Sequence, residues 1–249
     1  MRSPSLTRWA VPTLFGAAAA ITAAQATHSI AHALSEPTTR AWLIALYGVL
    51  RSAIAFAFAV FTVGRATPRH RSRSSVAFVA CGVAMLAVIA LTGPSASTPE
   101  SVVLAGDVLA VAFACWLLIA VLFLGRCFGV LPEARGLVRT GPYRFLRHPV
   151  YLGEMGACTG LALAAPSLLN AFVLTMFFLA QAVRMRLEER ALTQAFPEYA
   201  LYATRTPRLL PRLTRNGTTR VLASKRGPSE HPAPADPRSS ALTPPVTRA

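Results

Sequence analysis

The sequence predicts an all-α protein, a polytopic bundle of about six transmembrane helices. Two observations support this fold class. Hydrophobic residues make up 53% of the 249 residues and charged residues only 14%, whereas about a quarter of an ordinary soluble domain is charged. The apolar residues also fall in long uninterrupted runs, which is typical of a chain that crosses a bilayer.

Six apolar runs give the expected helices in order. They cover residues 9–34, 41–63, 76–92, 102–124, 150–165 and 167–183. The first four are long enough to cross a hydrocarbon core of about 30 Å, the third only just. Only Ala165, Pro166 and Ser167 join the last two runs, which predicts a tight helical hairpin.

The basic residues give these helices an orientation. Two connecting segments are strongly basic, with Arg65, Arg69, His70, Arg71 and Arg73 in one and Arg126, Arg135, Arg139, Arg144 and Arg147 in the other. Residues 93–101 contain no basic residue, and the tip of the hairpin is uncharged. Positively charged segments stay in the cytoplasm, so we expect both termini inside. The Ala- and Arg-rich composition suggests a bacterial inner membrane.

The ends of the chain differ in composition from its middle. Residues 1–33 have basic residues before an Ala-rich stretch and a small-residue site, so a cleaved signal peptide is an alternative to a first span. Residues 214–249 are rich in Arg, Pro, Ser and Thr and are expected to form a disordered cytoplasmic tail. We therefore expect N-terminal transmembrane helices in 1–100, a membrane domain in 101–213 and the tail in 214–249.

The net charge of +15 favours contact with anionic lipid headgroups. The basic residues lie in short clusters between apolar runs, which argues against nucleic acid as a partner. The four cysteines contain no CxxC pair, so we expect neither a disulfide framework nor a metal site. Arg51 and Asp107 each lie inside an apolar run, and we expect them to form an ion pair.

The most informative segment runs from Gly136 to Gly153, with the sequence GLVRTGPYRFLRHPVYLG. Thr140, Gly141 and Pro142 predict a turn. Pro149 suits the first position of the fifth helix and holds His148 extended. Aromatic, histidine and arginine side chains thus gather where a helix begins at the membrane surface, and a helix N-terminus favours anionic groups.

A second polar segment follows the hairpin, from Arg184 to Leu192, with the sequence RMRLEERAL. Arg184 and Glu188 are four residues apart and share a helical face. Leu192, Phe196 and Tyr199 continue an apolar stripe, so the sixth helix is expected to continue beyond the membrane. On spacing alone, an interfacial helix held by ion pairs is the better interpretation of this segment.

Together, GPYRxxRHPxYxG, RxxxEExxL, FxxxYxxY and the closing Pro-Arg-Leu-Leu-Pro resemble the isoprenylcysteine carboxyl methyltransferase family and its bacterial relatives. Phospholipid methyltransferases share a looser form. The likeness covers roughly residues 102–213. It implies S-adenosylmethionine as cofactor, a cytosolic C-terminal cofactor site, and methyl transfer to a lipophilic small molecule or lipid. Pro197 after Phe196 departs from the pattern, in which Gly is usual.

The resemblance also implies roles for individual residues. Arg184, Glu188 and Glu189 would be catalytic, with Arg184 or Arg186 facing the acceptor; the pattern fits Arg184 better. The cofactor would be held by Arg135, Gly136, Leu137, Val138, Tyr143, His148, Pro149, Val150, Tyr151 and Glu189. A carboxylate acceptor would need an arginine to orient it, whereas an amine or hydroxyl acceptor would need a base, either Glu188 or His148.

Two alternatives remain. Membrane steroid reductases carry a similar RHPxYxGE stretch, and Glu154 follows Gly153 here; such an enzyme would use NADPH. A non-catalytic membrane scaffold would tolerate changes at Glu189 or His148.

Overall fold

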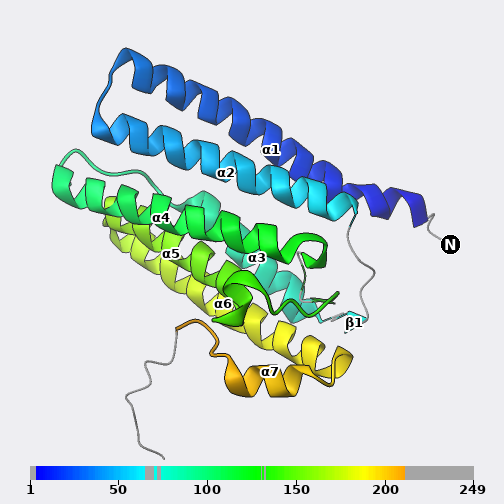
Figure 1. Ribbon diagram of the computed structural model, residues 1–249. Helices are drawn as coiled ribbons and strands as arrows, with labels where there is room; N and C mark the ends of the chain where they lie inside the picture. Colours follow the sequence, from blue (N-terminus) through cyan, green and yellow to red (C-terminus); the bar gives the residue numbers. More distant parts are fainter. Residues whose placement is uncertain (1–3, 65–69, 72–73, 130, 132, 211–249) are drawn as a thin grey trace, which may run out of the picture. The chain divides into compact units, whose positions relative to one another are not determined.

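A computed structural model describes residues 4–64, 70–71, 74–129, 131 and 133–210. The predicted tail lies outside the described residues. The described chain is mostly helical (Figure 1), with helices α1 (Pro4–Ser35), α2 (Thr39–Val63), α3 (Ser75–Ala90), α4 (Glu100–Leu124), α5 (Pro149–Ala164), α6 (Leu168–Ala195) and α7 (Tyr199–Arg205). Two 3-10 turns, η1 (Gly125–Cys127) and η2 (Gly141–Arg144), and a strand pair, β1 (His70–Arg71) with β2 (Glu133–Ala134), complete the fold.

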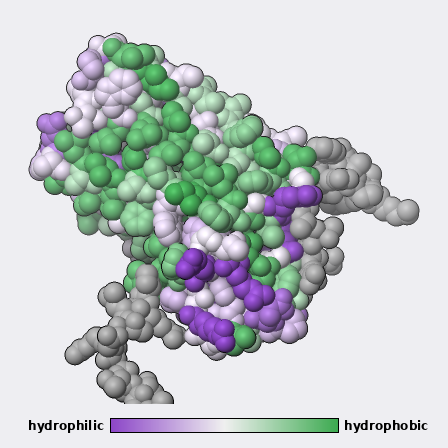
Figure 2. All heavy atoms as spheres, in the orientation of Figure 1, coloured by the Kyte–Doolittle hydropathy of each residue, from purple (hydrophilic) through white to green (hydrophobic). Residues whose placement is uncertain are grey.

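The six longer helices coincide with the six predicted apolar runs. By length and composition, α2, α6 and a span that joins α4 to η1 could each cross a membrane. Helix α3 is apolar but shorter. Figure 2 shows a largely hydrophobic surface over the helices, with hydrophilic residues gathered mainly at the lower right. These features indicate an integral membrane protein, while the number of spans remains a prediction.

The long helices pack against one another in close pairs. Helix α1 packs along α2, α4 packs along α5, and α3 packs along α6. Small residues permit the α4–α5 contact: a Cβ added at Gly106 would lie 2.6 Å from the carbonyl oxygen of Gly160, and one at Gly160 would lie 2.7 Å from that of Gly106. The two backbones are therefore as near as two glycines allow.

The predicted hairpin between the last two long helices is confirmed. Helix α5 ends at Ala164, and Ser167 caps α6 by accepting a hydrogen bond from Asn170 N at 3.0 Å. Asn170 is fully buried, and its side chain donates to Ala165 O at 2.7 Å and accepts from Thr92 N at 3.0 Å. This amide ties the hairpin to the segment after α3.

One expected ion pair is wrong. Asp107 pairs with Arg40, whose Nε lies 3.4 Å from Asp107 Oδ2. Arg51 instead donates a hydrogen bond to the side-chain oxygen of Gln25 on α1. The error arises because Arg40 and Arg51 are eleven residues apart on α2, about three helical turns, and the offset between α2 and α4 selects the partner.

Candidate functional site

The candidate site lies where the start of α5 meets the second half of α6. Pro149 occupies the first turn of α5, as predicted, and its carbonyl accepts a hydrogen bond from Trp116 Nε1 on α4 at 2.9 Å. The backbone N–H groups of Arg147 and His148 donate to the carbonyls of Pro207 and Arg208, at 2.9 and 3.1 Å. The segment after α7 therefore fixes the loop that precedes α5.

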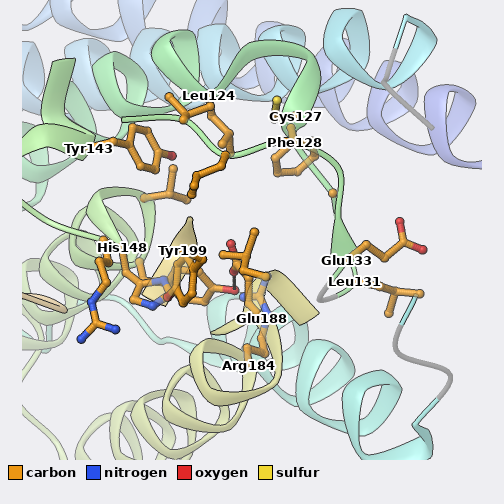
Figure 3. A pocket seen from close by; sticks show the side chains of 18 of the residues that line it. Leu124, Cys127, Phe128, Leu131, Glu133, Tyr143, His148, Arg184, Glu188 and Tyr199 are labelled. Carbon is orange, nitrogen blue, oxygen red and sulfur yellow. Dashed lines mark hydrogen bonds between the residues drawn. The ribbon is translucent and has the colours of Figure 1, made fainter. Parts of the chain in front are cut away.

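A pocket opens beside this loop (Figure 3), with an empty volume of ≈ 790 Å³ that includes open solvent. It takes residues from the end of α4, from 127–138, from η2 and the start of α5, and from α6 and α7. The lining comprises Leu124, Cys127, Phe128, Gly129, Leu131, Glu133, Gly136, Leu137, Val138, Tyr143, Arg147, His148, Val150, Tyr151, Glu154, Arg184, Glu188, Leu192, Tyr199 and Tyr202.

A polar network crosses the floor of this pocket. The Tyr151 hydroxyl donates to Glu188 Oε2 at 2.7 Å, and the Arg184 guanidinium lies 5.1 Å from the centre of the Tyr151 ring. Arg184 Nη1 is 3.6 Å from Glu154 Oε2 and donates to the Gln181 side-chain oxygen at 2.6 Å. Arginine, tyrosine and carboxylate side chains from α5 and α6 therefore hold one another in place.

The neighbouring carboxylate, Glu189, has different partners. Arg147 Nη1 lies 2.8 Å from Glu189 Oε1, and His148 Nε2 lies 3.1 Å from the same oxygen. Arg208 donates through Nε at 3.0 Å and through Nη2 at 2.5 Å. Glu189 is buried and does not line the pocket. It joins α6 to the His148 loop and to the segment after α7.

Burial and nearby charges raise the pKa values of several side chains around the pocket. Burial raises the pKa of Tyr199 and of Tyr202 to about 12, and it raises the pKa of Tyr143 well above the ordinary value. These hydroxyls therefore stay protonated at neutral pH and can donate hydrogen bonds. The Tyr202 hydroxyl donates to Tyr143 O at 2.5 Å. Contact with Glu189 raises the pKa of Arg208, so that cation persists.

Most of the predicted site residues are brought together. Those that line the pocket are Gly136, Leu137, Val138, Tyr143, His148, Val150, Tyr151, Arg184 and Glu188. Arg135, Pro149 and Glu189 are not among the lining residues. Arg135 is buried and hydrogen bonds to Glu133, and Pro149 is almost fully buried at the helix start. The roles of all twelve predicted residues in binding the cofactor or in the reaction stay a prediction.

Sequence reasoning missed part of the lining. Cys127, Phe128 and Glu133 lie between α4 and the first recognised motif, in a segment whose residue pattern carries no signal. Tyr199 was expected in an apolar stripe, and Tyr199 and Tyr202 both belong to the recognised motif that begins at Phe196, but no site role was assigned to either, and both line the pocket. Their hydroxyl groups on an otherwise apolar face were the available signal.

The lining groups suit a cationic, partly aromatic ligand. Glu188 and Glu133 supply carboxylates, and Tyr143, Tyr151 and Tyr199 supply aromatic rings, whose faces attract cations. Among the residues that the structure describes, the buried Nε of Arg184 has no hydrogen-bond partner. Within the described part of the chain, no three His, Cys, Asp or Glu side chains gather as metal ligands would.

Comparison with known proteins shows which family part of this chain is similar to. Residues 100–199 match the phospholipid methyltransferase family, which confirms the predicted resemblance for this part of the chain. Two curated proteins are also similar. The cobalt-zinc-cadmium resistance protein CzcN of Cupriavidus metallidurans is 43% identical over 79 residues, and the nickel-cobalt-cadmium resistance protein NccN of Alcaligenes xylosoxydans xylosoxydans is 39% identical over 79. Each match covers 31% of this chain and 37% of the relative.

Proposed function

We propose that the protein transfers a methyl group from S-adenosylmethionine to a lipophilic or lipid acceptor. The match of residues 100–199 to the phospholipid methyltransferase family supports this proposal. The reaction would take place at the cytosolic face of the membrane. The observation that carries this proposal is the position of Glu188, held by the Tyr151 hydroxyl beside Arg184 in a pocket built by both recognised motifs.

The pocket residues fit the cofactor by their chemistry. When bound, S-adenosylmethionine would supply a methyl group on a positively charged sulfonium. The rings of Tyr143 and Tyr151 suit that cation, and the Glu188 carboxylate suits an ammonium or ribose hydroxyl. Because such a displacement needs the acceptor in line with the methyl group, positioning by the protein supplies much of the rate enhancement.

Arg184 would orient the acceptor. Its guanidinium is held by Glu154, Gln181 and the Tyr151 ring, so its direction is fixed before a ligand arrives. A carboxylate acceptor would bind this arginine directly. An amine or hydroxyl acceptor would instead give up a proton, which Glu188 or His148 would accept.

Direct binding measurements test the cofactor assignment. S-adenosylmethionine and NADPH are titrated by calorimetry into detergent-purified wild-type protein, Glu188→Gln and Glu198→Gln. Glu198 is an exposed carboxylate paired at 3.8 Å with exposed Arg139, so its variant controls for the loss of one charge. We expect micromolar S-adenosylmethionine binding, at least tenfold weaker in Glu188→Gln and unchanged in Glu198→Gln.

The other outcomes are equally informative. Binding of NADPH in place of S-adenosylmethionine would support a reductase related to the steroid reductases. Folded protein that bound neither nucleotide would support a non-catalytic scaffold, and the methyltransferase proposal would be abandoned. Metal resistance is named only for the two relatives, and this proposal involves no metal.

A further inference from the structure

A second cavity lies next to the candidate site and has a different character. Its empty volume, which like that of the first pocket includes open solvent, is ≈ 950 Å³, and most of the side chains around it are apolar. They come from all six long helices and from Phe128: Phe15, Tyr47, Arg51, Ile54, Phe58, Cys81, Ala84, Met85, Val88, Ala114, Leu117, Phe128, Glu154, Ala157, Cys158, Phe177 and Arg184.

The cavity adjoins the proposed cofactor pocket. Phe128, Glu154 and Arg184 line both. A molecule in the apolar cavity would therefore have one end against Arg184, the residue expected to orient the methyl acceptor. Tyr47 and Arg51 line the cavity from the middle of α2, in the part of the chain that precedes the family match.

The charges on this lining do not balance. Two arginines and one glutamate line the cavity, so its formal charge is 2 − 1 = +1. Arg184 has the carboxylate of Glu154 at 3.6 Å. Arg51 hydrogen bonds to the neutral side chain of Gln25. A neutral partner lowers the cost of a cation inside the hydrocarbon region but leaves its charge in place, so Arg51 keeps a positive charge that is suited to pair with an anion.

We propose that this cavity binds an anionic amphiphile, whose charged group pairs with Arg51 and whose apolar body lies among the side chains of α2 to α6. That this molecule is also the methyl acceptor rests on the proposed function, because its other end would then meet Arg184. Helices α1 to α3 would accordingly select the acceptor, while the second half of the chain holds the cofactor.

The test measures charge preference at Arg51. Radiolabelled decanoic acid and decanol, which share a chain length, are equilibrated at pH 8 with protein in phosphatidylcholine nanodiscs, with empty nanodiscs as the blank. The variants are Arg51→Gln, Arg51→Lys and, as the control for one lost charge, Arg205→Gln, which changes an exposed residue of α7. Binding of S-adenosylmethionine is measured on each preparation.

Wild-type protein, Arg51→Lys and Arg205→Gln should bind decanoate at least tenfold more tightly than decanol, because each retains the cation in the cavity. Arg51→Gln should lose that preference and keep wild-type S-adenosylmethionine affinity, which also shows that it is folded. Equal binding of decanoate and decanol by the wild type, or an unchanged preference in Arg51→Gln, would overturn the inference. Decanoate preference without S-adenosylmethionine binding would support the cavity assignment and remove the methyltransferase proposal instead.

Discussion

Glu188 and Glu189 are adjacent in sequence, but their carboxylates have different partners. Glu188 lines the pocket and accepts a hydrogen bond from Tyr151. Glu189 is buried against Arg147, His148 and Arg208. The geometry therefore suggests a division of work in which Glu188 meets ligands and Glu189 supports the site.

This division predicts that two isosteric variants affect different properties, one stability and the other cofactor binding. Glu189→Gln removes the charge that holds two arginines, and we expect it to lower the free energy of unfolding by roughly 1.5–3 kcal/mol, the usual size of hydrogen bonds to charged groups. Glu188→Gln should change stability by less than about 1 kcal/mol while weakening cofactor binding. Thermal unfolding in detergent provides the comparison. Equal destabilisation by both variants would contradict the assigned roles.

The tyrosine hydroxyls near the pocket predict a dependence on alkaline pH. Burial raises the pKa of Tyr202 from 10.0 to about 12, so the folded protein holds this proton more tightly than the unfolded chain does. Its stabilising effect is fully present below pH 10 and is lost as the pH rises through about 12.

Tyr202→Phe tests this effect. At pH 8 the variant should be about 1 kcal/mol less stable, because the hydrogen bond to Tyr143 O is lost. Between pH 10 and 12 that difference should shrink, since only the wild type still has a proton to lose at this position. Melting temperatures at pH 8 and pH 11.5 decide the matter, and a gap of the same size at both values would show that Tyr202 does not titrate as described.

At the scale of single residues, sequence could predict contacts only where they were local. Pro149 begins α5 as expected, because the constraint of a proline acts on its immediate neighbours. Arg208 was noticed only within the closing Pro-Arg-Leu-Leu-Pro motif. Its contact with Glu189 depends on how the segment after α7 folds back, which no local pattern specifies.

Among the helices, the α4–α5 contact depends on small residues. The backbones meet at Gly106 and Gly160, where an added Cβ would clash with the facing carbonyl oxygen. The same helix pair stays close toward the start of α5, where a Cβ added at Gly153 would lie 2.7 Å from Leu117 Cβ on α4, so it also supports His148 and Tyr151. The packing of one helix pair therefore determines the geometry of the candidate site.

Gly160→Leu should separate the two helices, with a loss of several degrees in melting temperature and weaker cofactor binding. Overpacking of a close contact typically costs about 1–3 kcal/mol. Gly82→Ala in α3 is the matched control, because nothing lies within 4 Å of its added Cβ. That control should be neutral or stabilising by up to about 1 kcal/mol through helix propensity. A Gly160→Leu protein as stable as the control would disprove the close contact.

The position of each long helix could be read from the sequence because apolar runs and breaking residues are local signals. The hairpin followed from the short connection of Ala165, Pro166 and Ser167 between two apolar runs. Pairing between helices could not be read in this way. The correction at Asp107, which binds Arg40 rather than Arg51, shows why: a shift of three turns along α2 leaves its apolar pattern unchanged and alters every polar partner.

For the whole molecule, the open question is how many helices cross the membrane. Helices α3 and α5 each contain 16 residues, which corresponds to about 24 Å at 1.5 Å per residue. That is shorter than a hydrocarbon core of about 30 Å. Local thinning of the bilayer can accommodate a short span at modest cost, so six spans are possible with both termini in the cytoplasm.

Single-cysteine labelling can test that topology. In a variant that lacks the four native cysteines, cysteine is introduced at Ser97, between α3 and α4, at Ser167, between α5 and α6, or at exposed Thr140 before η2. If α3 and α5 both span the membrane, a membrane-impermeant maleimide added to intact cells should label positions 97 and 167. Position 140 should react only after the membrane is opened, because it lies among the basic residues that stay inside. Labelling at 97 without labelling at 167 would instead make α5 and the start of α6 a re-entrant hairpin, with Arg184 still near the cytosol.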